Sequence, residues 1–187
     1  MALQQVLHQL ELATQGQGFT RLDRQINQWL LGTGLWQGML HLSCLHTSCS
    51  LTINENADPR VLNDLADWMA DIVPESRCYS HDDEGADDMP AHIRTALTAQ
   101  TLSLSVDAGQ LVLGTWQAVY LWEHRRRPHQ RRVLCHLLGE PAAMETTSKT
   151  LNQQIQARHD PEAWAADGGI ETEVDLLVDQ LHDLADT

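Results

Sequence analysis

Alternating apolar and polar positions predict most of the strands in this chain. The run Gly38–His46 is apolar on both of its alternating sets, with Leu40 and Leu42 on one side and Met39 and Leu45 on the other. A strand that is apolar on both faces is typical of the middle of a sheet. Further alternating runs predict strands at residues 3–12, 50–54, 102–106, 111–113, 116–123 and 133–138, and the turn at 107–110 makes a hairpin of the third and fourth of these.

Two segments show the 3.6-residue periodicity of amphipathic helices. The first follows Thr20, which together with Asp23 resembles a capping box, and it ends near Gly32. The second begins at Asp58-Pro59, a strong helix start, and ends at Pro74. The apolar residues of their inward faces are Leu22, Ile26, Trp29 and Leu30 in the first helix and Leu62, Leu65, Met69, Ile72 and Val73 in the second.

The order of these elements indicates a fold class. Several strands are joined by short turns, and two longer helical insertions interrupt them. This pattern predicts an α+β domain built on antiparallel sheet, with two to three helices.

The character of the chain changes after Glu140. Residues 1–140 carry 16 acids and 10 bases, whereas residues 141–187 carry 10 acids and 2 bases among short runs typical of linkers. We therefore divide the chain into a domain at 1–140 and an acidic linker with a C-terminal helix at 141–187. That helical extension is predicted from an apolar stripe, which either packs weakly on its own domain or binds a partner: Val174, Leu177, Val178, Leu181 and Leu184.

Composition excludes several classes of partner. The formal net charge of −14 argues against nucleic acid and anionic membranes, because both need a cationic surface. The sequence contains no run of about 18 apolar residues, which is the length needed to cross a bilayer. The spacing of the four cysteines fits neither a zinc ribbon nor a dense disulfide framework. We expect a soluble, cytoplasmic protein with free thiols.

The most unusual stretch is His81–His92, in which five carboxylates lie between two histidines. It predicts a polar loop, followed by a short helix that Asp88 or its neighbour caps. A third histidine, His124, ends the strand predicted at 116–123. Neutral imidazoles that converge on an open position commonly hold a catalytic zinc ion. We expect the metal ligands to be His81, His92 and His124, although ten histidines will place some at strand ends by chance.

Other charged groups near this loop have two interpretations. The loop carboxylates either bind a divalent cation such as magnesium, together with a phosphorylated ligand, or stay hydrated. The arginine-rich segment 125–132 either clamps a phosphate or forms a solvated loop tip, and Arg125, nearest the strand end, is the strongest phosphate candidate.

Four motifs together resemble the YjbQ-like family, also called UPF0047. They are His-Thr-Ser-Cys-Ser-Leu-Thr-Ile-Asn-Glu-Asn-Ala-Asp-Pro at 46–59, the stretch 81–92, Gly-Gln-Leu-Val-Leu-Gly-Thr-Trp-Gln at 109–117 and Glu-His-Arg at 123–125. The resemblance covers residues 1–140. It implies a sandwich of antiparallel β-sheets that assembles as a homotrimer around a polar, metal-binding pocket.

The resemblance also implies an activity. Members are described as secondary thiamine-phosphate synthases, transferases that join an aminopyrimidine diphosphate to a thiazole phosphate. The implied catalytic residues are Glu84, Asp87, Asp88 and Arg125, with zinc or magnesium as the divalent metal. The implied ligand-binding residues are His46, Ser48, Asn54, Asn56, Trp116 and Gln117. The alternative is a zinc-dependent hydrolase or a non-catalytic trimer that binds a metal or ligand.

Two residues depart from the family pattern. Cys49 stands where the family usually has alanine, and Ala118 stands where Trp-Gln is usually followed by glycine. We expect each to add atoms beside the pocket and so to change the shape of the ligand it accepts. The segment after Glu140 has no counterpart in the pattern.

Overall fold

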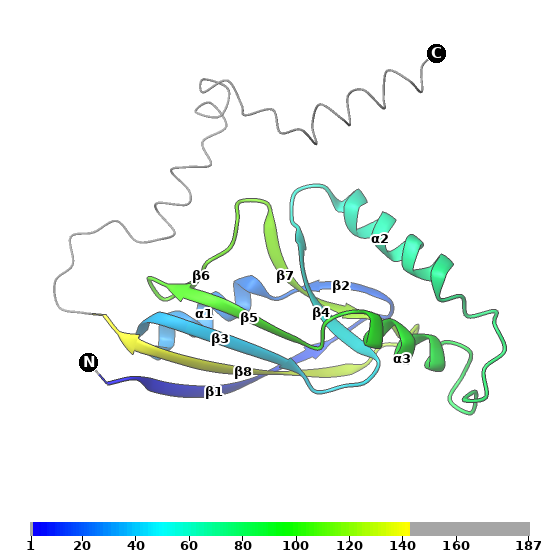
Figure 1. Cartoon of the computed structure of the whole chain (residues 1–187), viewed down its shortest axis with the longest axis horizontal. Helices are drawn as coiled ribbons and strands as arrows, with labels where there is room; N and C mark the ends of the chain where they lie inside the picture. The colour runs from blue at the N-terminus through cyan, green and yellow to red at the C-terminus, as the bar shows by residue number, and fades with distance from the viewer. Residues whose placement is uncertain (1, 143–187) are drawn as a thin grey trace, which may run out of the picture.

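Two antiparallel sheets and three helices form the protein, in a computed structural model that describes residues 2–142 (Figure 1). Sheet A contains, in spatial order, β1 (Gln4–Ala13), β8 (Gln130–Pro141), β3 (Leu35–Cys44), β5 (Thr101–Asp107) and β6 (Gln110–Leu111). Sheet B contains β2 (Gly18–Arg21), β7 (Gln117–Glu123) and β4 (Cys49–Glu55). The helices are α1 (Asp23–Thr33), α2 (Pro59–Ile72) and α3 (Asp88–Leu97).

The main core lies between sheet A, one face of sheet B and α1. Leu40 and Leu42 of β3 and Leu121 of β7 are fully buried in it, as are Ile26 and Leu30 of α1. The prediction that the run at 38–46 forms a central strand is confirmed, because β3 pairs with β8 on one side and β5 on the other.

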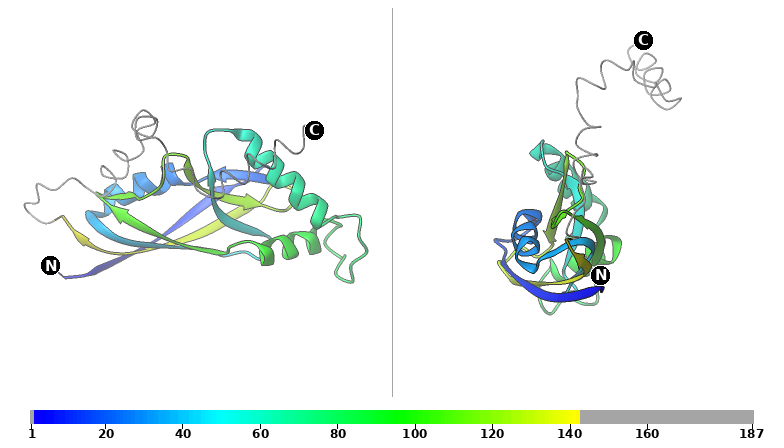
Figure 2. Two further views of the ribbon diagram at one scale, coloured as in Figure 1. Left: turned by 45° about the horizontal axis from the view of Figure 1, so that its top comes forward. Right: turned by 90° about the vertical axis from the view of Figure 1, so that its left-hand side faces the viewer.

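The other face of sheet B is covered by α2 and α3 (Figure 2). Its buried core is small and consists of Met69, Val73 and Trp122, against which Phe19, Leu65 and Ile93 pack. The alternation along β7 explains the two cores, since Val119 and Leu121 face sheet A while Trp122 faces the helices. Sheet B is therefore the middle layer of the molecule.

A buried ion pair joins the two sheets. Glu123, at the end of β7, accepts hydrogen bonds from Arg131 of β8 at 2.5 and 2.6 Å and from the hydroxyl of Thr14 at 2.8 Å. Burial raises the pKa of the Glu123 carboxyl, but these hydrogen bonds and one from the backbone N–H of Arg125 outweigh it, so the pKa is lowered. The carboxylate is thus kept ionised where the sheets meet.

The starts of the two longer helices differ in how well the sequence predicts them. Asp58 caps α2 as predicted, because its carboxylate accepts a hydrogen bond of 2.9 Å from the backbone N–H of Arg60. The capping box predicted at Thr20 is wrong, since Thr20 belongs to β2 and pairs with Leu121. No side-chain hydrogen bond within the described residues caps α1.

Two further predictions concern the C-terminal segment and membrane-spanning helices. The predicted C-terminal helix at 174–184 lies outside the described residues. Of the helices within 2–142, none is both long and apolar enough to pass through a membrane.

Candidate metal centre

The loop at 81–87 and the first turns of α3 bring two histidines and an aspartate together. Asp88 and His92 are four residues apart on α3, a spacing that places both side chains on one face of the helix. His81 reaches the same point from the loop. Within the described residues, ligand atoms of His81, Asp88 and His92 all lie within 4.8 Å of one another. Asp88 Oδ2 is 2.8 Å from His81 Nε2 and 3.7 Å from His92 Nε2. We call this group the metal cluster.

The carboxylate at the centre of the metal cluster is buried, with Asp88 only 2 % exposed. Its Oδ1 accepts a hydrogen bond from Arg125 Nη1. Its Oδ2 makes no hydrogen bond to any residue in the described range, despite its closeness to two imidazoles. A buried carboxylate oxygen without a hydrogen bond is costly, and a cation shared with the two imidazoles would satisfy it. The donor set therefore fits a divalent metal.

A backbone contact orients His92. Its Nδ1 lies 2.9 Å from the carbonyl oxygen of Thr47, which can only accept a hydrogen bond. Nδ1 therefore carries the proton, and Nε2 presents its lone pair to the metal cluster, the arrangement usual for a metal-bound histidine. His81 is about half exposed, so the cluster stays open to a ligand from solvent.

Arg125 is fully engaged by the acidic loop. Besides Asp88, its Nε donates to Asp87 Oδ2 at 3.1 Å and its Nη2 donates to the backbone carbonyl of Glu84 at 3.0 Å. Burial raises the pKa of Asp87, but the backbone N–H of Arg126 and the side chain of Arg125 outweigh it and lower the pKa overall. Arg125 therefore positions the carboxylates of Asp87 and Asp88. The carboxylate of Glu84 is mostly exposed, with its Oε2 3.8 Å from Arg125 Nη1.

The third predicted ligand, His124, is not in the metal cluster. It is buried on the face of sheet B that meets α2, and its Nε2 lies 2.9 Å from the hydroxyl of Ser50. Burial lowers its pKa to about 3, and the positive charge of Arg94 contributes to the shift. The structure thus joins two of the three predicted ligands with Asp88, which the family resemblance implied to be catalytic. The sequence signal that could have added Asp88 to the candidate ligands is its spacing of four residues from His92.

His46 and Ser48 lie in the turn between β3 and β4. His46 Nε2 accepts a hydrogen bond of 2.8 Å from the backbone N–H of Arg132, and burial lowers its pKa. The same turn supplies the Thr47 carbonyl that orients His92. Their role in ligand binding stays a prediction.

The other four predicted ligand-binding residues lie at the opposite end of sheet B. Antiparallel pairing puts Glu55 beside Gln117 and Cys49 beside Glu123, which separates the two ends by roughly 20 Å. The amide of Asn56 ties the far end together, because Nδ2 donates to the carbonyl oxygen of Gln117 at 2.9 Å. Asn54 and Trp116 are at that end too, and Trp116 is 62 % exposed. Within one chain these residues do not meet the metal cluster.

The two departures from the family pattern are interior residues. Cys49 is fully buried in the main core, with its Sγ 3.2 Å from that of Cys44. Ala118 is fully buried in β7. Neither contributes an atom to the metal cluster, so the expected change in ligand shape at that cluster is not supported.

Comparison with known proteins identifies the family of this chain. The family model for "UPF0047 protein YjbQ-like" matches residues 8–140. A UPF0047 protein of Synechocystis sp. is 50 % identical over 132 residues, which cover 70 % of this chain and 90 % of the relative. The UPF0047 protein YjbQ of Escherichia coli O157:H7 is 42 % identical over 132 residues, which cover 70 % of this chain and 96 % of the relative.

Solved structures show the same architecture. A YbjQ-like protein of unknown function from Sulfolobus solfataricus P2 superimposes with a TM-score of 0.67 at 22 % identity and covers 74 % of this chain and all of its own. An uncharacterised YjbQ/UPF0047 protein from Clostridium acetobutylicum gives a TM-score of 0.62 at 30 % identity over 71 % of this chain and 98 % of its own.

Proposed function

This chain belongs to the YjbQ-like family UPF0047, and from that membership and the metal cluster we propose a metal-dependent transferase that acts on a phosphorylated small molecule. The proposed reaction resembles that of secondary thiamine-phosphate synthases. The observation that carries the proposal is the buried Asp88 Oδ2, which faces two imidazoles and has no hydrogen bond from the described residues.

The donor set favours zinc or a similar transition ion over magnesium. Two imidazoles and one carboxylate are typical zinc ligands, whereas magnesium prefers oxygen ligands and keeps several waters. His81, Asp88 and His92 would hold the ion. When bound, the ion would act as a Lewis acid that offsets negative charge on the leaving diphosphate.

The proposed step transfers the pyrimidine group while the protein holds the metal ligands in place. In the proposed step the thiazole nitrogen forms a bond to the pyrimidine methylene carbon, and the bond from that carbon to the diphosphate oxygen breaks. The diphosphate leaves with the electron pair, so the step needs no general base. Arg125 and the Thr47 carbonyl would keep Asp88 and His92 in fixed positions throughout.

The direct test is product formation from the two precursors. Tag-free protein is incubated with aminopyrimidine diphosphate, thiazole phosphate and zinc or magnesium, and thiamine phosphate is measured by mass spectrometry. We expect product from the wild-type protein and from Arg24→Ala, a control at an exposed position of α1. His81→Ala should lose the activity. A wild-type rate no higher than that of His81→Ala would refute the transferase.

A zinc-dependent hydrolase is the second candidate, and one observation favours it. Two histidines and a carboxylate with open positions are also the ligand type of hydrolytic zinc enzymes. The same assay separates the two, because a hydrolase releases diphosphate from the aminopyrimidine substrate when thiazole phosphate is left out. The transferase releases it only when both substrates are present.

We also propose that the chain forms a homotrimer. The outward side of sheet A carries exposed apolar side chains on three neighbouring strands, at Leu7 of β1, Met39 of β3 and Leu138 of β8. An exposed apolar patch of this kind is typical of a protein–protein interface. Light scattering of the protein as it elutes from a size-exclusion column should give three times the chain mass. A monomer mass would contradict the proposal.

A further inference from the structure

Two cysteines lie in contact beneath the turn that joins the two sheets. Cys44 ends β3 in sheet A, and Cys49 begins β4 in sheet B. Their Sγ atoms are 3.2 Å apart, and Cys44 Sγ also lies 3.4 Å from the carbonyl oxygen of Cys49. A disulfide holds its sulfurs about 2.05 Å apart, so the two atoms would have to approach by only about 1 Å. The pair is therefore one small displacement from a covalent bond.

The turn at residues 45–48 gives a small oxidant a route to this pair. Cys49 is fully buried, whereas Cys44 is 9 % exposed and its Sγ lies 4.0 Å from the carbonyl oxygen of His46 in the turn. Leu45 and Thr47 of the same turn are exposed. Only Cys44 has to be reached from solvent, because Cys49 would react afterwards, inside the protein.

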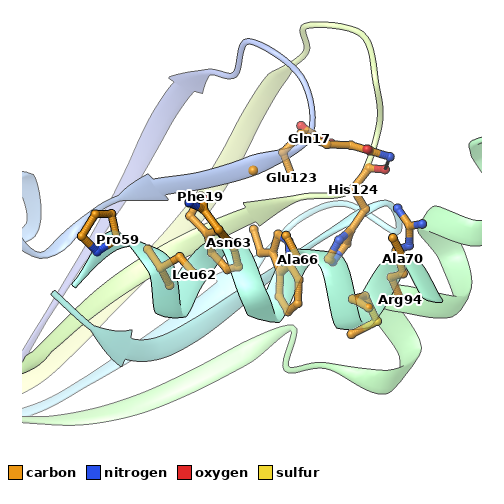
Figure 3. A pocket seen from close by; sticks show the side chains of 13 residues that line it. Gln17, Phe19, Pro59, Leu62, Asn63, Ala66, Ala70, Arg94, Glu123 and His124 are labelled. Carbon is orange, nitrogen blue, oxygen red and sulfur yellow. Dashed lines mark hydrogen bonds between the residues drawn. The ribbon is translucent and has the colours of Figure 1, made fainter. Parts of the chain in front are cut away.

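The other face of sheet B is separate from the cysteine pair. Cys49 and Leu51 face the main core, so Ser50 between them projects to the opposite side, where its hydroxyl contacts His124. A cavity of about 330 Å³ lies on that side, under α2, and His124 is part of its lining (Figure 3). Of the described residues that line this cavity, none is a cysteine. A change in the pair would therefore act first on the turn.

The two thiols differ in how readily they ionise. The hydrogen bond between them lowers the pKa of the Cys44 thiol. The same hydrogen bond raises the pKa of the Cys49 thiol, and burial raises it further. Because the thiolate rather than the thiol attacks an oxidant, Cys44 is the sulfur that reacts first and Cys49 is the resolving thiol.

The turn between the cysteines also orients a member of the metal cluster. The carbonyl oxygen of Thr47 lies 2.9 Å from His92 Nδ1 and holds that ring in place. Drawing Cys44 and Cys49 together by about 1 Å would move both ends of this short turn. A hydrogen bond weakens steeply when its geometry is disturbed. The contact that fixes His92 is therefore sensitive to the state of the two sulfurs.

We infer that Cys44 and Cys49 form a reversible disulfide in the presence of a peroxide, and that this disulfide weakens metal binding through the turn at 45–48. The Cys44 thiolate attacks one oxygen of hydrogen peroxide, which forms a sulfenic acid as the O–O bond breaks. The Cys49 sulfur then forms the S–S bond as the S–O bond breaks. The net reaction oxidises both thiols by two electrons and reduces one peroxide to two waters. The effect on metal binding rests on the proposed metal cluster, whereas the disulfide does not.

Peptide mapping tests the disulfide. Tag-free, full-length protein is treated with hydrogen peroxide, freed of it, unfolded in guanidinium with N-ethylmaleimide and digested with trypsin. Trypsin releases residues 25–60 as one peptide, which contains both cysteines and no other. We expect this peptide to carry neither label, and to carry both when dithiothreitol is added before labelling. Two labels without dithiothreitol, or no recovery with it, would overturn the disulfide.

Zinc titration before and after peroxide treatment tests the coupling. Oxidised wild-type protein should bind zinc about tenfold more weakly than reduced protein, at the low end of the effect of groups that orient metal ligands. Cys49→Ala keeps the exposed Cys78 but cannot form the disulfide, so its zinc affinity should not respond to peroxide. Cys135→Ala removes another buried cysteine and should respond like the wild type.

The outcomes separate this inference from the proposed function. Equal zinc affinity of oxidised and reduced wild-type protein would overturn the coupling and leave the metal cluster standing. An equal loss of affinity in Cys49→Ala would also overturn it, because the effect would not come from the disulfide. Reduced protein that binds no zinc would refute the metal cluster, and the coupling with it.

Discussion

Arg125 and Asp88 form an ion pair that engages only one oxygen of the aspartate. Arg125 Nη1 donates to Asp88 Oδ1, whereas Oδ2 lies 2.8 Å from His81 Nε2 and has no hydrogen bond within the described chain. Arg125 is itself held by Asp87 and by the backbone carbonyl of Glu84. The ion pair therefore points a carboxylate at two imidazoles, and the guanidinium that we predicted to contact phosphate is engaged by the acidic loop.

Arg125→Gln should weaken zinc binding without removing a ligand. Groups that orient metal ligands typically contribute about 10- to 100-fold to affinity, and we expect a loss in that range. Isothermal titration of the metal-free protein with zinc measures it. Arg127→Gln, an exposed arginine of the same loop, is the control and should match the wild type. Equal zinc affinity in Arg125→Gln and Arg127→Gln would remove the positioning role.

Replacing individual histidines distinguishes the ligands in the structure from those predicted by the sequence. His92→Ala removes a member of the metal cluster and should abolish stoichiometric zinc binding. His124→Gln alters a buried group outside the cluster and should leave the zinc affinity within about two-fold. Metal content after dialysis, measured by mass spectrometry, reports both. If His124→Gln loses zinc and His92→Ala keeps it, the cluster is not the metal site.

The strands were predictable because alternation is a local property. The run at 38–46 reads as a central strand in isolation, and β3 is one. Which sheet a strand joins is not local, however, and the turn between β3 and β4 carries the chain from sheet A to sheet B. The error at Thr20 has the same origin, since pairing with Leu121 across sheet B overrides a local capping signal.

The arrangement of the candidate site was predictable only where it depends on local spacing. The spacing of Asp88 and His92 on one helix is local, and the structure places them together. The position of His124 depends on the side of β7 from which it projects and on the helix that covers that side. Neither can be read from the spacing of 32 positions between His92 and His124. The cavity under α2 gave no sequence signal, because a void depends on how well two elements fit.

Burial of His124 should make the protein less stable in mild acid. Its pKa is about 3 in the folded protein and about 6.5 when unfolded. Between these values only the unfolded chain binds the proton, so the free energy of unfolding falls as the pH drops through that interval and is insensitive to this group above it. From pH 7 to pH 5 the expected loss is about 2 kcal/mol.

Urea unfolding at pH 7 and pH 5 measures this contribution. His124→Gln should lose about 2 kcal/mol less than the wild type over that interval. His129→Gln, which changes a histidine of the loop before β8, should lose as much as the wild type. Identical pH dependence in the wild type and His124→Gln would contradict the assignment.

The Glu123–Arg131 ion pair should be costly to break from one side. Arg131→Met leaves the Glu123 carboxylate buried without its partner, and we expect a loss of about 3–5 kcal/mol in the free energy of unfolding. Arg132→Met, at the exposed neighbouring position of β8, is the control and should change stability by less than about 0.5 kcal/mol. Adding Glu123→Gln to Arg131→Met should restore part of the loss. If Arg131→Met is no less stable than Arg132→Met, the pair does not join the sheets.

Anomalous X-ray scattering from crystals of the tag-free protein grown with zinc tests the central claim most directly. A difference map at the zinc absorption edge locates the ion without reference to chemical assumptions. The metal cluster predicts one strong peak about 2.0–2.2 Å from His81 Nε2, His92 Nε2 and Asp88 Oδ2. A peak on His124, or crystals that contain zinc with no peak at these three residues, would contradict it.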